Sequence, residues 1–394
     1  MQYLLAILGF GALIAAHEFG HLLAARAFRI RVDRFSIGFG PAILSFRHRQ
    51  IEWVLAAIPI GGYVRVHGMN PHEEGDLKSD PSSFAARRWW QREIVLAAGS
   101  IANWILAWGL LATLFVSGTH VPVPLAIGTV EPGSEAARAQ LRPGDVIAGV
   151  DGRPLEEWKN LVEAVADNPG RRIRLDVRRG ESAVPVDVVP RPDARGLGRI
   201  GVTQQYVYRE YRLREALPLA LRTSVELLED DARLLWRLIR GKPGVELASP
   251  IGIVKQASDA AAVGLDAFLR VLVHLSLALA VFNLLPFPAL DGGRMLFIAI
   301  ETATGRPVNP RLETALHGSG FVLLVTLIAF AAIGDVRRLL ARARTGDGAP
   351  APTAVAPANG TSTPDASRTD VDDIPGYLPA DPSHPDGAKP DADP

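Results

Sequence analysis

Long apolar runs alternate with polar links along the chain, and four of the runs are long enough to cross a hydrocarbon core of about 30 Å. These runs are residues 2–25, 94–117, 271–290 and 318–334. The chain starts with MQYLL, which has no basic residue, and ionisable side chains occupy the place of a small-residue cleavage site. Both features favour a retained helix over a cleaved signal peptide. The pattern predicts a polytopic α-helical membrane protein with four transmembrane helices.

The polar link between the first two runs is rich in arginine, with nine between Ala27 and Glu93. Because basic links stay in the cytoplasm, we expect this link inside and the amino terminus outside. Alternation then places residues 118–270 and the carboxyl terminus on the outer side. Four arginines after the last run argue the opposite for the carboxyl terminus: Arg337, Arg338, Arg342 and Arg344. The side of that terminus stays open at this stage.

The longest link begins with residues 119–205, where β-branched runs alternate with turns, so we expect a small β-rich domain there. A strand, a helix with the spacing GSxAxxAxL, a PGDVI strand, a DG turn and a further helix follow one another. This order resembles the PDZ domains associated with bacterial proteases, which bind peptide ends by adding a strand to an exposed sheet edge. Gln140 stands where that family usually has glycine.

The remaining segments divide by composition. Residues 206–262 are expected to form an amphipathic helix and a linker, because residues 211–241 carry apolar side chains at helical spacing. That helix would lie near the membrane surface or pack against the PDZ-like domain. Residues 1–118 and 263–344 then contain two transmembrane helices each. Residues 345–394, rich in proline and aspartate, are expected to be a disordered tail.

Overall composition narrows the possible chemistry. Of the 394 residues, 48% are hydrophobic, and 42 basic side chains balance 42 acidic ones, so bulk charge gives no sign of nucleic-acid binding. The chain has no cysteine, which excludes disulfides, thiolate metal sites and a cysteine nucleophile. Any metal ligand must therefore be His, Asp or Glu.

The first apolar run contains the sequence HEFGH, from His17 to His21. On a helix the two histidines project from one face and can bind one metal ion, with Glu18 beside them as a general base. Such a pattern also occurs by accident on soluble helices. Inside an apolar span, however, three ionisable groups at one level are costly and indicate function. We therefore expect a metal site in the first membrane helix.

A catalytic zinc site usually has three protein ligands and an open position, so another carboxylate or imidazole is expected at the same depth. Asp291 meets this requirement at the end of the third apolar run, in NLLPFPALDGG. Since the first and third spans run in the same direction, both ligand sets would lie near cytoplasmic ends. Pro286 and Pro288 would break the helix just before this aspartate. The alternative is a helix that merely ends at a DG turn.

Five segments together resemble the site-2 protease family of intramembrane zinc metalloproteases, and within it the bacterial regulator-of-sigma-E proteases. They are HEFGH, FSIGFGP (35–41), IPIGGYV (58–64), SPIGIV (249–254) and NLLPFPALDGG (283–293). The fold implied is four transmembrane helices with a membrane-re-entrant β-hairpin and one inserted PDZ-like α/β domain. Two departures are Ser100, where the family's second span usually has proline, and a single PDZ-like domain in place of the pair of some relatives.

The resemblance also implies roles for individual residues. The zinc ligands would be His17, His21 and Asp291. Glu18 would be the catalytic acid and base, and Asn283 would hold the substrate or the oxyanion, although a helix-capping or interhelical role is equally open for this asparagine. The re-entrant hairpin and an edge strand that pairs with unwound substrate would supply the substrate-binding residues Gly38, Gly40, Gly61, Gly62 and Tyr63.

The implied function is cleavage of single-pass membrane proteins inside the lipid bilayer of the bacterial inner membrane, with the PDZ-like domain on the outer side. The substrate would be an anti-sigma factor or a remnant signal peptide. A non-enzymatic scaffold is the first alternative, and the complete HExxH and LDG motifs argue against it. A metal transporter is the second, but the ligands cluster at one depth without a second polar site. Whether the PDZ-like domain binds peptide ends or excludes bulky substrates stays open.

Overall fold

The computed structural model describes residues 2–70, 77–193, 196–240, 250–306 and 308–345. Contacts divide these residues into two compact units, of which the first joins residues up to 118 to those from 210 onward, and the second comprises residues 119–209. Two features of the sequence interpretation, Ser249 of the SPIGIV segment and the tail beyond residue 345, lie outside the described residues.

Four helices in the described part of the first unit are long and apolar enough to cross a membrane. They are α1 (Gln2–Ala27), α2 (Trp89–Ser117), α7 (Leu265–Asn283) and residues Arg311–Gly334 of α9 (Pro310–Thr345). The prediction of four helices long and apolar enough to span a membrane is confirmed for the described residues. The expected bounds of the third span, residues 271–290, are wrong: the helix ends at Asn283, because prolines 286 and 288 cannot continue the helical hydrogen bonding.

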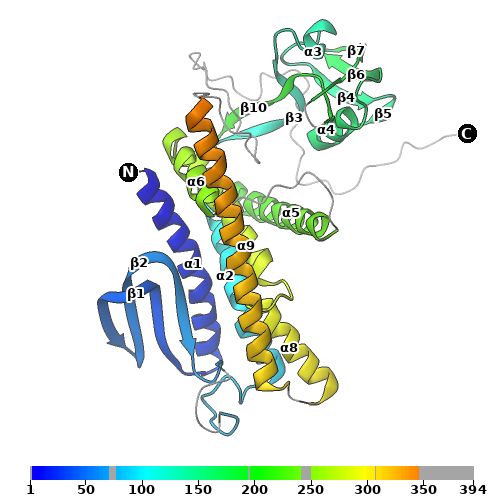
Figure 1. The fold of residues 1–394 in the computed structure, drawn as a ribbon. Coiled ribbons are helices and arrows are strands. Elements are labelled where there is room, and N and C mark those ends of the chain that lie inside the picture. The colour runs from blue at the N-terminus through cyan, green and yellow to red at the C-terminus, as the bar shows by residue number, and fades with distance from the viewer. Residues whose placement is uncertain (1, 71–76, 194–195, 241–249, 307, 346–394) are drawn as a thin grey trace, which may run out of the picture. The chain divides into compact units, whose positions relative to one another are not determined.

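The described residues of the first unit form three further helices: α5 (Leu213–Ile239), α6 (Pro250–Val263) and α8 (Asp291–Thr304). Helix α5 is the expected amphipathic helix, and its face with Ala216 and Ala220 is buried against α2 and α7. The segment expected to be a linker contains α6, which packs against α1 and α7. Figure 1 shows α2 inside this bundle, where it contacts α1, α5, α7 and α8.

A long β-hairpin follows α1 and lies against it (Figure 1). Its strands are β1 (Val32–His48) and β2 (Ile51–Val66). Phe35 pairs with Val64 on one side and with Trp53 on the other, while Trp53 also pairs with Phe46. Each long strand therefore bends and contributes two segments to one four-stranded sheet, and we call these segments rows. The row order is 58–66, 32–39, 51–56 and 42–48. The 58–66 row is therefore an edge of this sheet, and it faces α1.

A polar clasp joins the end of the hairpin to the segment before α2. His67 Nε2 lies 2.8 Å from Asp80 Oδ2, and Arg31 Nη2 lies 3.0 Å from His67 Nδ1. The backbone N–H and hydroxyl of Ser82 both donate to Asp80 Oδ1 at 2.8 Å. These hydrogen bonds, with the one from His67, lower the pKa of Asp80 to about 2. The clasp fixes residues 80–82 to the end of the hairpin.

The second unit is a small β-rich domain with its own core. Its main sheet has the order β10, β3, β4, β6 and β7, with β5 beside β4. The core is built from buried aliphatic side chains of these strands and of α4, such as Ile127, Leu161 and Leu175. The element bounds are β3 (Thr119–Val130), α3 (Glu135–Arg138), β4 (Val146–Val150), β5 (Arg153–Pro154), α4 (Trp158–Ala166), β6 (Ile173–Arg179), β7 (Ser182–Val188), β8 (Arg191–Pro192), β9 (Gly198–Arg199) and β10 (Val202–Arg209).

Two local features affect the stability of this domain in opposite directions. Gln140, which replaces the glycine usual in PDZ domains, follows α3 with a φ of 59°, the left-handed conformation that glycine adopts more readily. The geometry of the helix end is thus kept, but with a side chain that strains it. The second feature is the buried carboxylate of Asp145, which receives two hydrogen bonds from Arg179, at 2.8 and 2.7 Å. Although burial opposes it, this pairing lowers the pKa of Asp145.

Candidate metal centre

Helix α1 supplies the HEFGH residues. His17 and His21 lie one turn apart on the face of α1 that is buried against α2. Gly20 allows the two helices to approach, because a Cβ at that position would overlap the backbone carbonyl of Ala98 in α2. Small residues at such crossings are the usual way for membrane helices to pack closely. The two imidazoles are therefore enclosed between helices in the structure.

Asp291 comes from a different element than expected. It does not end the third span but is the first residue of α8, after a non-helical segment that begins at Leu284. Gly292 and Gly293 pack directly on the carbonyls of this segment, where any Cβ would overlap Leu285 and Phe287. The backbone N–H of Ala289 donates to Nδ1 of His317 at 2.9 Å, which ties the segment to α9. The proline-containing turn thus sets the direction in which α8 starts.

The three side chains meet at one point. His17 Nε2 lies 3.1 Å from Asp291 Oδ2, His21 Nε2 lies 3.2 Å from the same oxygen, and the two Nε2 atoms are 3.2 Å apart. Tetrahedral zinc with ligand bonds of about 2.0–2.1 Å separates its ligand atoms by ~3.3 Å. Two imidazole nitrogens and one carboxylate oxygen at this spacing therefore fit a zinc ion, and their chemistry is that of a catalytic site with an open position.

The surroundings of the imidazoles support the same fit. Nδ1 of His21 lies 2.7 Å from the carbonyl oxygen of Val95, a contact that fixes the ring with Nε2 toward the other ligands. Gly99 of α2 lies against both rings: a Cβ there would be 2.5 Å from His21 Nε2 and 2.6 Å from His17 Cε1. Only glycine leaves room for the two rings as they stand.

Glu18 lies between the three converging side chains and the hairpin. Its Oε2 accepts a hydrogen bond of 3.0 Å from the backbone N–H of Val64, in the 58–66 row. A Cβ on Gly62 would lie 3.8 Å from Cγ of Glu18, so the row passes directly over this side chain. The carboxylate is thus held at one oxygen by the sheet edge.

The other residues expected at the site are placed as follows. Asn283, the last residue of α7, donates from Nδ2 to the carbonyl of Leu279 at 3.0 Å, a bond within its own helix. Tyr63 accepts a hydrogen bond from Arg34 at 3.2 Å. Three hairpin glycines have a positive φ, the conformation in which other residues are strained: Gly38, Gly40 and Gly61. A Cβ on Gly62 would lie 2.7 Å from the carbonyl oxygen of Ser36.

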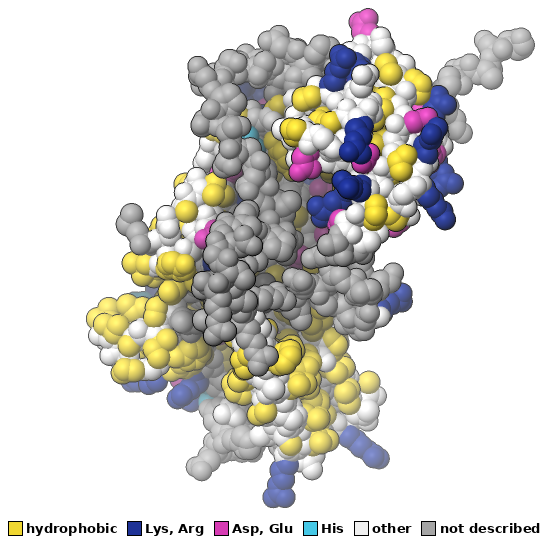
Figure 2. Space-filling view, turned by 45° about the horizontal axis from the view of Figure 1, so that its top comes forward, with side chains coloured by type: hydrophobic (Ala, Val, Ile, Leu, Met, Phe, Trp, Pro, Cys, Tyr) yellow, Lys and Arg dark blue, Asp and Glu magenta, His cyan; other side chains and the backbone are white. Residues whose placement is uncertain are grey.

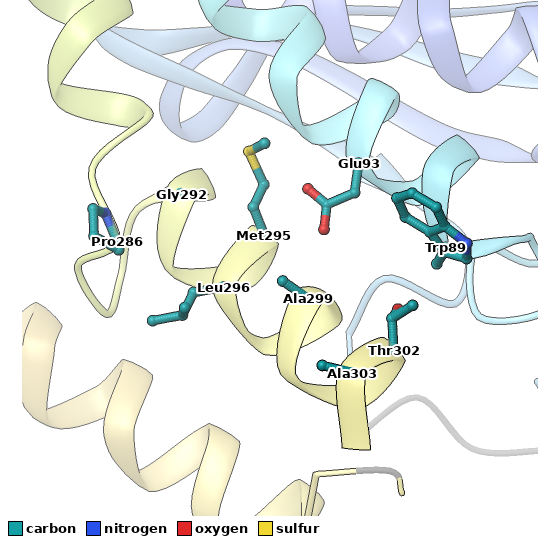
Figure 3. A pocket seen from close by; sticks show the side chains of 9 residues that line it. All are labelled: Trp89, Glu93, Pro286, Gly292, Met295, Leu296, Ala299, Thr302 and Ala303. Carbon is teal, nitrogen blue, oxygen red and sulfur yellow. The ribbon is translucent and has the colours of Figure 1, made fainter. Parts of the chain in front are cut away.

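The sequence interpretation gave Ser100 only as a departure from the family pattern, and it did not anticipate the other residues of α2 near the centre. Ser100 and Asn103 in α2 are buried, and the polar atoms of their side chains have no hydrogen-bond partner among the described residues. Gly99 was also missed, because nothing in the sequence shows that its missing side chain faces the histidines. A hollow of about 600 Å³ opens between α2 and α8 beside Gly292 (Figure 3). Glu93 points into this largely apolar hollow and is not part of the metal centre.

Comparison with known proteins gives consistent matches. The sequence profile of peptidase family M50 matches residues 5–327. A protein of Agrobacterium fabrum named "putative zinc metalloprotease" is 31% identical, over 85% of this chain and 95% of its own. The regulator of sigma-W protease RasP of Bacillus subtilis is 27% identical, over 84% of this chain and 97% of its own. Among solved structures, the PDZ domain of an SdrC-like protein from Listeria monocytogenes matches 21% of this chain and 93% of its own, with a TM-score of 0.19 and 21% identity.

Proposed function

The chain belongs to peptidase family M50, the site-2 proteases, and on that premise we propose that it cleaves single-pass membrane proteins within their transmembrane segments. It is a membrane zinc metalloprotease, and zinc is its cofactor. The proposed substrates are an anti-sigma factor or a remnant signal peptide that another protease has already trimmed. The relative named a regulator of sigma-W protease supports this place in regulated intramembrane proteolysis.

The observation that carries the proposal is the convergence of two histidines of α1 with the first residue of α8. His17, His21 and Asp291 would bind the zinc ion through Nε2, Nε2 and Oδ2, because these atoms lie within 3.2 Å of one another. Three protein ligands leave the fourth position free for reactants. When bound, zinc supplies a Lewis acid that activates water and polarises the peptide carbonyl.

Glu18 is the proposed general base and acid. The Val64 N–H engages Oε2, so Oε1 is the atom left to take a proton from the attacking water. The same oxygen would then deliver the proton to the nitrogen of the leaving peptide. The hydrogen bond from the sheet edge orients the carboxylate for both transfers, and its position next to His17 and His21 keeps it within reach of the reacting atoms.

Asn283 is the proposed oxyanion or substrate contact. In the structure its amide donates to Leu279, so it must rotate away from its own helix to reach a substrate. Its position supports this role, because it is the last residue of α7 and directly precedes the segment that leads to Asp291. An amide donor at this point could stabilise negative charge on the carbonyl oxygen.

The 58–66 row is the proposed site for the unwound substrate strand, through Gly61, Gly62 and Tyr63. One edge of the row pairs with β1, and the other faces α1 beside Glu18. A peptide added at such an edge gains main-chain hydrogen bonds whatever its side chains are. Gly38 and Gly40 allow β1 to bend beneath this row, because both adopt a φ of 90°.

We also propose a topology for the chain in the inner membrane. The hairpin re-enters the bilayer from the cytoplasmic side, and the PDZ-like domain lies on the outer side, where it binds peptide ends or excludes bulky substrates. The hairpin exposes large apolar side chains such as Ile43, Leu44 and Phe46, which supports its contact with lipid. A reporter fused after residue 345 tests the path of the chain, since a cytoplasmic signal would contradict alternation through four spans.

Cleavage by purified protein tests the function. The full chain, reconstituted with a model single-span substrate, should cleave it with zinc and lose activity with a chelator. Glu18→Gln should abolish cleavage while zinc stays bound, because this residue is not a ligand. Glu93→Gln is the matched control: the same substitution in the same unit should leave cleavage intact. Equal cleavage by the Glu18 and Glu93 variants, or none by the wild type, would overturn the proposal.

Metal content tests the third ligand separately. Asp291→Ala should lower bound zinc per chain, because it removes one of three donors. Asp266→Ala in α7 serves as the control, since this carboxylate pairs with Arg270 one turn away and is not among the three converging side chains. Full retention of zinc by the Asp291 variant would show that another group completes the site.

A further inference from the structure

A basic hollow lies where the end of α1 meets the turn between β1 and β2. Its volume is about 400 Å³, and its lining contains no acidic residue. We call it the arginine hollow, and its polar lining consists of Arg26, Arg29, Arg31, Arg49, Gln50 and Ser82. Four guanidinium groups around one concave surface create a positive potential that attracts an anion.

Most of this charge is not neutralised within the protein. Arg31 pairs with Asp33 at 2.9 Å and also contacts His67. The side chains of Arg26, Arg29 and Arg49 form no hydrogen bond or ion pair with any residue that the structure describes. Three unpaired guanidinium groups repel one another, and an anion between them would remove that repulsion. Arginine also presents a planar set of donors that matches phosphate oxygens.

The backbone holds these arginines in a defined and strained arrangement. Arg29 has a φ of 58°, and Arg49 and Gln50, the two residues of the hairpin turn, have φ values of 46° and 67°. Residues other than glycine are strained in this region, because Cβ comes too close to the following carbonyl oxygen. A turn of this kind usually contains asparagine and glycine. Buried Ile30, which follows Arg29, and buried Ile51, which follows Gln50, fix both segments in the core. Strain that the surroundings maintain in this way is typical of binding sites.

An apolar surface begins directly beside the hollow. The 42–48 row ends one residue before Arg49 and exposes Ile43 (68%), Leu44 (58%) and Phe46 (55%). Phe46 is three residues from Arg49, about 10 Å along a strand. Figure 2 shows hydrophobic side chains gathered over the hairpin at the left of the view, with basic side chains below them. The basic hollow thus lies next to an exposed apolar surface, an arrangement that matches the anionic headgroup and the acyl chains of an anionic phospholipid.

We propose that the arginine hollow binds the phosphodiester headgroup of an anionic phospholipid whose acyl chains lie along the 42–48 row. The position fits a membrane boundary, since Arg26 lies in the last turn of the first span. A basic pocket at this level is how membrane proteins select anionic lipids. This inference rests on the membrane insertion of the hairpin and not on proteolysis. A bound lipid would anchor the sheet whose other edge holds Glu18.

Lipid binding to the full-length protein in neutral detergent micelles tests the proposal. The ligands are short-chain phosphatidylglycerol, phosphatidylcholine and inorganic phosphate, and binding is measured by native mass spectrometry and by titration calorimetry. Wild type should bind phosphatidylglycerol at least tenfold more tightly than phosphatidylcholine, and inorganic phosphate more weakly than phosphatidylglycerol. Arg29→Gln combined with Arg49→Gln should abolish this preference. Arg29→Lys combined with Arg49→Lys should retain part of it, because lysine keeps the positive charge but not the planar set of donors.

A matched control removes the same charge elsewhere. Arg306, in the link between α8 and α9, and Arg311, in the first turn of α9, are exposed and lie outside the hollow. This link is at the same end of the unit, because Glu301 of α8 pairs with Arg92 at the start of α2 and Arg87 bonds to the backbone of Arg29. The Gln double variant at 306 and 311 should keep the lipid preference.

Three results would overturn the inference. One is equal binding of phosphatidylglycerol and phosphatidylcholine by wild type. Another is an equal loss of the lipid preference in the Gln double variants at 29 and 49 and at 306 and 311. That result would show that binding depends only on the overall positive charge of this face. The third is binding of free phosphate as tightly as phosphatidylglycerol, which would make the hollow a site for small anions. Bound zinc per chain, measured in every variant, shows that the protein remains folded, so a failure here is separate from a failure of the protease proposal.

Discussion

Gly99 offers a sharp test of the metal centre, because the perturbation is a single methyl group. In Gly99→Ala the new Cβ would lie 2.5 Å from Nε2 of His21 and 2.6 Å from Cε1 of His17. Unbonded carbon atoms normally stay about 3.5–4.0 Å apart, so the rings must move by ~1 Å. Metal–ligand distances tolerate only about 0.2 Å. The rings therefore cannot clear the methyl group and keep their places around the ion.

We expect the affinity for zinc to fall roughly 100-fold or more, which corresponds to about 2.8 kcal/mol. The effect on the helix has the opposite sign, since alanine is favoured over glycine in helix interiors by about 0.8–1.0 kcal/mol. Zinc affinity is measured by competition with a chromophoric chelator on the purified full chain in micelles. Cleavage of the model substrate in excess zinc provides a second readout.

Gly109→Ala is the matched control within the same helix. No atom lies within 4 Å of a Cβ built on Gly109, so the methyl group enters open space. This variant should keep wild-type zinc affinity and cleavage. If Gly99→Ala binds zinc within twofold of Gly109→Ala, the packing of α2 against the histidines is not what the structure indicates, and the reasoning fails.

Three further predictions concern the rest of the chain. Gln140→Gly should stabilise the fragment 119–209 by about 0.5–1 kcal/mol in urea unfolding, because glycine adopts a positive φ without strain, and an unchanged or lower midpoint would contradict this. Arg179→Met should destabilise the same fragment by roughly 2–3 kcal/mol, since Asp145 loses two charged hydrogen bonds, and a loss equal to that of exposed Arg172→Met would refute the pairing. The pKa of Asp80 is lowered to about 2. The stabilisation of the clasp by the ionised carboxylate is therefore fully present above pH ~4, the ordinary pKa of aspartate, and is lost as the pH falls toward 2. Protease nicking between the hairpin and α2 should therefore rise over that interval in wild type and be raised already at neutral pH in Asp80→Asn.

The sequence predicted those parts of the fold that depend on local pattern. Four apolar runs became four apolar helices, and HEFGH placed His17 and His21 on one helical face, because helical spacing alone determines both features. The same logic failed at the third run, where apolar residues continue past Asn283 although the helix does not. Hydrophobicity sets the environment of a segment, whereas the two prolines set where its helix stops.

The remaining features depend on contacts between distant segments. The sequence interpretation expected Asp291 near the histidines at the end of the third span, whereas in the structure its Oδ2 lies within 3.2 Å of both Nε2 atoms from the start of α8. The role of Gly99 follows from an absent side chain, which leaves no signal in one sequence. The bond between Glu18 and Val64 depends on the register of a sheet that folds back on itself. Such contacts are decided by packing and not by local propensity.

The metal centre joins residues from opposite ends of the membrane unit, and this has a consequence for biosynthesis. His21 and Asp291 are separated by 270 residues (291 minus 21). At about 5–20 residues per second, a ribosome needs ~14–54 s to make that interval. During this time the histidines are already in place while their third partner does not exist. A chain cut short anywhere before Asp291 therefore lacks one of the three converging side chains, so incomplete products of translation would not carry the complete proposed zinc site into the membrane.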